Sequence, residues 1–163
     1  MSQLPPPGLQ QSDGIPFDIR GAIRLRSNRH IFNGTPFPGG VRGIPVERTC
    51  RKIHYVYSVE EPLNERLTTE ELTLIFADGT RFGLSLTSKK QFPAPHQAEG
   101  ADDGSPETRV AKTPKSSAGS PPSPILHQGI WINPWPDLEI VALHFQEWNS
   151  EHTGAALFAI TVE

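Results

Sequence analysis

The chain has 163 residues, a formal net charge of −3 and a single cysteine, Cys50. A chain of this length has room for one domain with a real core, and its weakly negative charge favours neither nucleic acid nor an anionic membrane surface as a partner. One cysteine excludes an intrachain disulfide and a cysteine-based zinc site, and no apolar run is long enough to span a bilayer.

Residues 1–14 are rich in proline and glutamine and show no apolar period. The sequence therefore predicts a flexible N-terminal lead, followed by a single domain over residues 15–163. The lead lacks the basic region and the apolar core of a secretory signal. These features leave the compartment of the protein undetermined.

A strand is predicted just after this lead, because apolar and basic residues alternate from Ile19 to Arg26 with a period of two. Its basic side chains are Arg20, Arg24 and Arg26. They could form an anion-binding stripe, or they could be a solvated strand face whose charge protects the sheet edge. The second interpretation needs no ligand, and we adopt it.

Residues 44–59 are predicted to form a strand pair or one long, bent strand, entered through a Pro/Gly-rich loop at 36–43 that lets the chain change sheets. Here Ile53, Tyr55, Tyr57 and Val59 share one face. Tyrosines in such a position bury their rings and keep their hydroxyls at a rim. Tyr57 is therefore a candidate to contact a ligand.

The clearest local signal is a β-hairpin around Asp78-Gly79. Apolar residues alternate over 72–76, and the alternation resumes over 82–86 after the turn Ala77-Asp-Gly-Thr80. Alternation on both sides of Asp-Gly is the strongest short-range hairpin pattern.

Residues 92–124 are dominated by Pro, Ser, Ala, Gly and mixed charge. Such a segment cannot bury enough apolar area to offset the entropy of ordering it. Because strands resume beyond it, we predict a long disordered insert within the domain. Its Ser/Thr-Pro pairs are, alternatively, docking or modification sites.

Three strand signals follow the insert: a short one around Trp131, one over residues 138–145 that is apolar on both faces, and a last one over 155–162. A proline-locked turn between the first two carries Trp135. A strand that is apolar on both faces lies centrally or changes environment along its length. No stretch shows a 3.6-residue period, so the sequence predicts an all-β fold, an antiparallel β-sandwich or jelly roll.

Four phrases resemble a group of bacterial β-sandwich modules. They are Gly43-Ile-Pro-Val-Glu-Arg-Thr-Cys-Arg-Lys-Ile-His-Tyr-Val-Tyr57, Leu74-Ile-Phe-Ala-Asp-Gly-Thr80, Trp131-Ile-Asn-Pro-Trp-Pro-Asp-Leu-Glu-Ile140 and Ala155-Ala-Leu-Phe-Ala-Ile-Thr-Val-Glu163. The resemblance implies a galactose-binding-domain-like jelly roll, the architecture of many carbohydrate-binding modules, within multidomain and often extracytoplasmic proteins. A tryptophan-bearing segment often follows the hairpin in that group, and the Pro/Ser-rich insert replaces it here.

The tryptophans Trp131, Trp135 and Trp148 are the first candidates to stack on a sugar ring, because aromatic faces offer apolar contacts to pyranose faces. The competing interpretation places Trp131 in the core between the sheets and lets Trp135 cover its turn.

Asn133, Asp137 and Glu139 offer oxygen atoms around one turn, and a structural calcium is the cofactor they suggest. Calcium needs six to eight oxygens, so three donors fall short without backbone carbonyls. The simpler interpretation is that Asn133 and Asp137 bind the amides of their own turn.

No catalytic motif is present, and the histidines show no metal-ligand spacing. Cys50 and His54 are too far apart along a strand to form a thiol–imidazole pair. The sequence therefore predicts a non-catalytic module that binds carbohydrate or another polar ligand. The alternative is a protein-interaction or scaffolding domain whose contact element is the insert.

Overall fold

The computed structural model describes residues 7–12, 14–26, 37–59, 70–86, 107–111, 126–147 and 154–163. Within these ranges all regular secondary structure is β-strand, and every strand pairing is antiparallel. The strands are β1 (Gly8–Ser12), β2 (Ile15–Ile19), β3 (Ile23–Arg24), β4 (Gly40–Arg48), β5 (Lys52–Val59), β6 (Glu70–Phe76), β7 (Arg81–Leu86), β8 (Glu107–Ala111), β9 (Leu126–Ile132), β10 (Ile140–Glu147) and β11 (Ala155–Val162).

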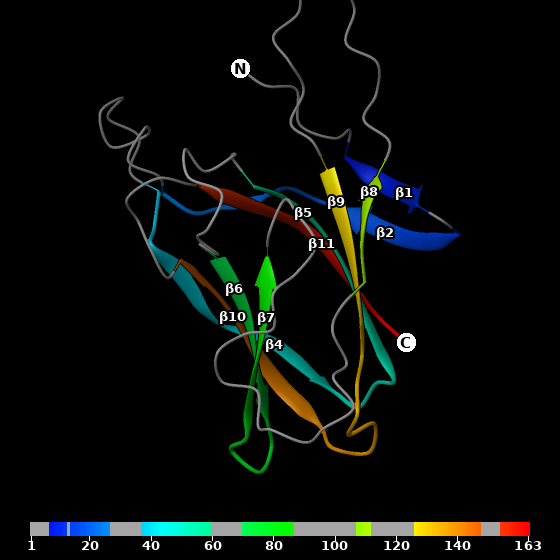
Figure 1. Ribbon diagram of the computed structural model, residues 1–163, viewed down its shortest axis with the longest axis vertical. Helices are drawn as coiled ribbons and strands as arrows, with labels where there is room; N and C mark the ends of the chain where they lie inside the picture. The colour runs from blue at the N-terminus through cyan, green and yellow to red at the C-terminus, as the bar shows by residue number, and fades with distance from the viewer. Residues whose placement is uncertain are drawn as a thin grey trace, which may run out of the picture.

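Two sheets face each other, as Figure 1 shows. One has four strands in the order β4-β10-β6-β7, and the other has five in the order β3-β11-β5-β9-β8. The predicted all-β fold, an antiparallel β-sandwich, is confirmed. None of the described residues forms a helix that is long and apolar enough to cross a membrane.

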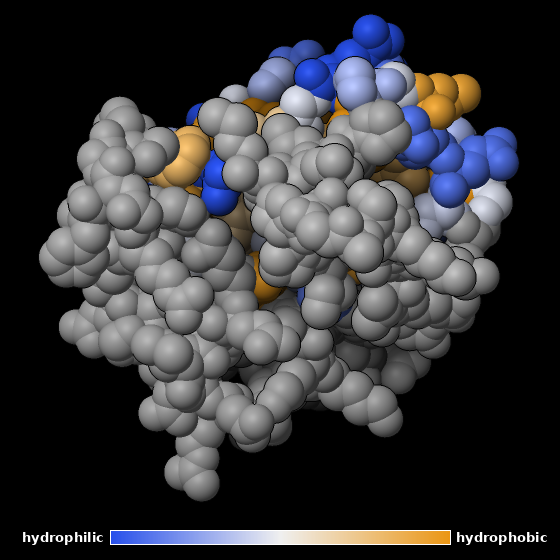
Figure 2. All heavy atoms as spheres, turned by 90° about the horizontal axis from the view of Figure 1, so that it is seen from above, coloured by the Kyte–Doolittle hydropathy of each residue, from blue (hydrophilic) through white to orange (hydrophobic). Residues whose placement is uncertain are grey.

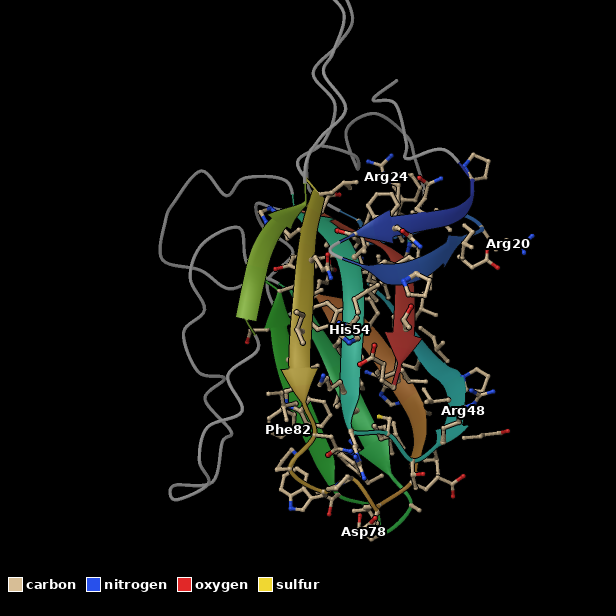
Figure 3. All side chains as sticks on the ribbon, turned by 90° about the vertical axis from the view of Figure 1, so that its right-hand side faces the viewer. Arg20, Arg24, Arg48, His54, Asp78 and Phe82 are labelled. Atoms are coloured by element: carbon tan, nitrogen blue, oxygen red, sulfur yellow. The ribbon has the colours of Figure 1, made fainter. Side chains whose placement is uncertain are left out.

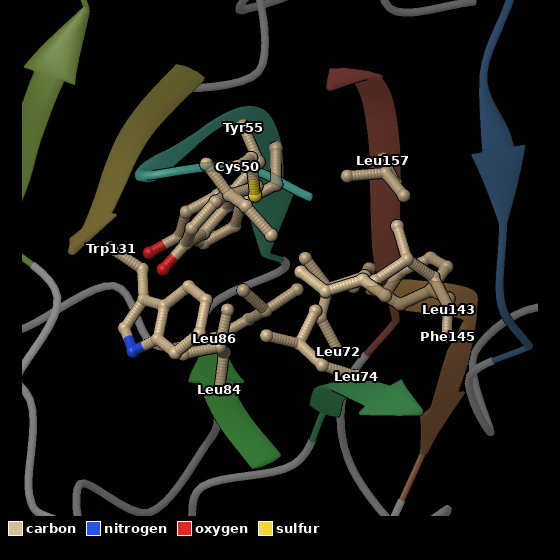
Figure 4. Close-up of a cluster of buried hydrophobic side chains, with 14 of the residues drawn as sticks. Cys50, Tyr55, Leu72, Leu74, Leu84, Leu86, Trp131, Leu143, Phe145 and Leu157 are labelled. Atoms are coloured by element: carbon tan, nitrogen blue, oxygen red, sulfur yellow. The ribbon is translucent and has the colours of Figure 1, made fainter. Parts of the chain in front are cut away.

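The core lies between the sheets and takes one face of each (Figure 4). From the four-stranded sheet come the alternating leucines and phenylalanines of β6, β7 and β10, and from the five-stranded sheet come the inward side chains of β5, β9 and β11. Its largest members have no more than 1% of their surface exposed: Trp131, Tyr55, Tyr57, Phe76 and Phe145. Alternation with a period of two therefore places one apolar face of each sheet in the interior.

The Asp-Gly hairpin is present where it is predicted. β6 pairs with β7 through Ala77–Thr80, and Gly79 adopts a φ of 87° that favours glycine. The Asp78 carboxylate accepts hydrogen bonds from the amide and the hydroxyl of Thr80, at 2.8 and 3.0 Å. Both bonds lie within the turn itself and stabilise it locally.

The segment 44–59 is two strands that belong to different sheets. β4 pairs with β10 in the four-stranded sheet, whereas β5 lies between β11 and β9 in the other. The chain crosses from one sheet to the other at residues 49–51, where Cys50 is buried. Neither a simple pair nor a single bent strand describes this segment.

β10 is central, as its two apolar faces predict, but an irregularity changes which residues face inward. Its register with β6 passes from Ile140↔Phe76 to Ala142↔Ile75, so β10 has one extra residue, Val141, at this point. As a result, Ile140, Leu143 and Phe145 are all buried although strict alternation would separate the first from the other two.

The N-terminal hairpin β1–β2 forms a third layer on the outer face of the five-stranded sheet (Figure 1). Phe17 and Ile19 pack there against Val56, Ala156 and Phe158. The prediction of a flexible lead over residues 1–14 is therefore wrong for Gly8–Ser12. Backbone pairing with β2 orders these residues and does not need apolar side chains in β1, so composition alone could not reveal it.

Within the predicted insert, residues 107–111 form β8, which pairs with β9 at the edge of the five-stranded sheet. The other residues of 92–124 lie outside the described part of the chain, and so does Trp148. Residues 107–111 are thus a strand that lies within the predicted insert.

Candidate ligand-binding site

Three connections meet at one end of the sandwich: the β6–β7 turn, the β9–β10 turn and the β4–β5 crossing. The amide of Ala77 donates to the carbonyl of Glu139 at 2.9 Å, and the amide of Asn133 donates to the carbonyl of Arg51 at 2.9 Å. These bonds join segments that are far apart in the sequence into one rigid surface. We call it the turn end; Figure 3 shows it at the bottom, near Asp78 and Phe82.

Asn133 is the residue that links two of these connections. Its side chain is 4% exposed. The Nδ2 group donates to the carbonyl of Cys50, and the Oδ1 atom accepts from the amide of Trp135, both at 2.9 Å. The predicted bond from Asn133 to an amide of its own turn is present, and a second bond anchors that turn to the β4–β5 crossing.

The two other oxygen donors, Asp137 and Glu139, are exposed on the same turn. Within the described ranges, no group of three or more His, Cys, Asp or Glu side chains could hold a metal ion. Calcium at this turn therefore has no such set of ligands among the described residues.

Trp135 lies on an aromatic support at the turn end. Its ring stands nearly perpendicular to those of Phe76 and Phe82, with centroid distances of 5.7 and 5.9 Å. Phe82 in turn packs against Trp131 at 5.2 Å. Trp135 keeps 39% of its surface exposed, so it is both accessible and held in one orientation.

The two other predicted ligand residues are in the interior. Trp131 and Tyr57 each have 0% of their surface exposed. The Tyr57 ring stacks on Tyr55 and on His127, at 5.7 and 5.3 Å. In this conformation a ligand at the protein surface contacts neither Trp131 nor Tyr57, and only Trp135 of the three presents a ring to solvent.

Phe82 was not predicted as part of this site, because its place in the alternating pattern of β7 marks it only as a core residue. Asp78 was not predicted there either, and its carboxylate lies at the same end as Trp135 because the β6–β7 and β9–β10 turns are bonded to each other. Neither residue carries a local signal of function; their relation to Trp135 is set by contacts between distant segments.

The cysteine of the β4–β5 crossing is not a reactive group here. Cys50 is 5% exposed, and burial raises the pKa of its thiol. The thiolate is the nucleophilic form of cysteine. A buried thiol with a raised pKa forms little thiolate, so Cys50 acts as a small core side chain rather than as a nucleophile.

Arg20 and Arg24 lie at the opposite end from Asp78 and Phe82 (Figure 3). Arg20 forms an ion pair with Asp18 at 2.8 Å, and Arg26 forms one with Glu147 at 2.6 Å. Arg24 lies over the Phe37 ring at 4.8 Å. Each therefore has a partner within the protein, which agrees with a solvated face rather than an anion-binding stripe. Figure 2 looks onto this end, where the described residues along one side are mostly hydrophilic.

Two histidines make the stability of the protein depend on pH in a known direction. Burial lowers the pKa of His127 from its ordinary 6.5, and burial together with Arg42 and Arg81 lowers the pKa of His144. Below about pH 6.5 the unfolded chain therefore binds more protons than the folded one, so the free energy of unfolding declines as the pH falls through this range.

Urea denaturation at several pH values between about 7.5 and 5.5 measures this decline. His127→Phe keeps the ring that stacks on Tyr57 but cannot take up a proton, so the variant should lose part of the pH dependence. A free energy of unfolding that rises on acidification would contradict the assignment.

The comparisons with known proteins add no relative: no family model matches the chain, and neither the curated proteins nor the solved structures include a match. A function for this protein is therefore inferred from the side chains of the turn end.

Proposed function

We propose that this β-sandwich is a non-catalytic binding module whose ligand, a carbohydrate or another polar molecule with an apolar ring face, stacks on Trp135. The observation that supports it is the position of this side chain. A tryptophan that is 39% exposed and braced by Phe76 and Phe82 loses little side-chain entropy when a ligand binds.

Polar groups at the same end complement the ring. Asp78, Thr80 and Asp137 are exposed there, and carboxylate and hydroxyl oxygens accept the hydrogen bonds of sugar hydroxyls. A ligand of this class needs such an arrangement: an aromatic ring for its apolar face and a few oriented polar groups for its rim. Residues 131–140 also resemble a segment of bacterial β-sandwich modules, and the architecture which that resemblance implies is that of many carbohydrate-binding modules.

The test is a glycan array followed by calorimetric titration of any glycan that binds. Trp135→Ala should weaken that binding by about fivefold or more, since the stacking of one ring contributes roughly 1–3 kcal/mol. Leu9→Ala is the matched control, because Leu9 is 70% exposed on the N-terminal hairpin and distant in the fold. Binding that survives Trp135→Ala unchanged would refute the stacking role, and the absence of any bound glycan would refute the carbohydrate class.

A second candidate, a protein-interaction domain, is favoured by one observation. Ile132, three residues before Trp135, is 63% exposed, and large exposed apolar side chains are typical of interaction surfaces. Ile132→Ser distinguishes the two functions: a protein partner that uses this surface would be lost on co-purification, whereas a glycan stacked on Trp135 would be retained.

A further inference from the structure

The outer face of the four-stranded sheet carries a block of polar side chains that is separate from Trp135. The strand registers place Ser85, Glu71 and Gln146 opposite one another in one row, and Gly83, Thr73 and His144 in the next. Opposed residues are about 5 Å apart and neighbouring rows about 7 Å. We call these six residues, five with polar side chains and Gly83, the polar face.

Glu71 is the centre of this face. Its side chain lies over Gly83, where an added Cβ would be 2.6 Å from the carboxylate carbon. The hydroxyl of Thr73 donates to its Oε1 atom at 2.6 Å. Glu71 and Thr73 are 8% and 9% exposed although they point away from the core. The bond from Thr73 holds this carboxylate in one position beside the more exposed side chains of His144 and Gln146, which lie opposite Thr73 and Glu71 in β10.

The polar face is flanked by two arginines. Arg81 is the residue of β7 before Phe82, and Arg42 precedes Gly43, whose φ of 70° accompanies a register shift between β4 and β10 beside His144. The registers place Arg81 in the row next to Thr73 and His144, and Arg42 in the irregular part of β4 opposite His144. Burial lowers the pKa of His144, and both arginines lower it further. Neither forms an ion pair with a carboxylate in the described part of the chain.

We propose that the polar face is a second binding site, whose ligand is a hydroxylated carboxylate of the uronic-acid class. Two guanidinium groups against one carboxylate leave a net positive charge that complements the ligand's carboxylate. Gln146 then meets its hydroxyls, since an amide both donates and accepts. The neutral imidazole of His144 offers a further donor and acceptor.

This site goes beyond the proposed function and does not depend on it, because it uses other residues and another ligand class. The probe is sodium glucuronate, titrated into the full-length protein and followed by calorimetry or by amide chemical shifts. Glucose supplies hydroxyls without the charge, and acetate supplies the charge without the hydroxyls. Both should bind at least about tenfold more weakly than glucuronate, because glucose lacks the bonds to the arginines and acetate lacks those of the hydroxyls.

Arg42→Gln and Arg81→Gln test the residues. Each arginine is exposed, so the fold tolerates its loss. Each variant should weaken glucuronate binding by about fivefold or more, while the control Arg20→Gln, whose arginine pairs with Asp18, leaves it unchanged. Trp135→Ala should also leave it unchanged, which separates this site from the turn end.

Four results would overturn the proposal: no binding of glucuronate, equal binding of acetate, equal binding by both arginine variants, or loss of binding in Trp135→Ala alone.

Discussion

Replacing Gly129 with alanine is expected to lower the free energy of unfolding by at least about 3 kcal/mol, the range of severe overpacking. Gly129 lies in β9 directly opposite Tyr55, and the tyrosine ring lies so close over it that an added Cβ would overlap the ring carbons. Tyr55 is 0% exposed and packed on Tyr57, so it cannot move aside without disturbing the core.

Urea denaturation of the variant measures the loss, and circular dichroism shows whether the variant folds. Gly21→Ala is the matched control, because Gly21 is exposed, has no atom within 4 Å of an added Cβ and no positive φ. That change should be neutral or slightly stabilising, through the lower entropy of the unfolded chain. A Gly129→Ala protein as stable as the Gly21→Ala protein would disprove the close contact with Tyr55.

Trp131→Ala is expected to cost about 3–5 kcal/mol, the usual range for a fully buried aromatic residue. The side chain is 0% exposed and packs on Phe82. Trp131→Phe keeps much of that contact and should cost clearly less. Trp135→Ala removes a side chain that is 39% exposed and should cost no more than about 1–2 kcal/mol.

We therefore expect Trp131→Ala to lower mainly the free energy of unfolding and Trp135→Ala to lower mainly the affinity for the ligand. Denaturation curves of the two alanine variants, recorded at one pH, test this. Equal stability losses would show that Trp135 is as much a part of the core as Trp131.

Sequence alone predicts the parts of the fold that local chemistry determines. The β6–β7 hairpin is one of them, because alternation and the turn residues Asp78 and Gly79 act within a short stretch. The change of sheet at residues 49–51 has no such local signal: β4 and β5 find different partners only when β10, β11 and β9 are in place. The same reason explains the missed strand β1, whose order comes from pairing.

The candidate site also has features that local sequence determines and features that depend on contacts between distant segments. The turn of Trp135 and the bond made by Asn133 are predictable, because proline and asparagine act on neighbouring backbone. Whether a tryptophan is buried is decided by the other sheet, and so Trp131 and Trp135, four residues apart, differ in a way that no pattern reveals. The polar face was not predicted either, because its rows join residues from three strands that only the sheet register aligns.

The order of strands in the two sheets has a consequence for the synthesis of this protein. β10 lies between β4 and β6, and β11 lies between β3 and β5. Of the strand pairings described here, only the β1–β2 and β6–β7 hairpins join strands that both precede β8. Until β10 and β11 leave the ribosome, β3 and β4 have no partner and β5 has only β9, so open strand edges can pair with other chains. Neither sheet can therefore be completed before β10 and β11 have been synthesised.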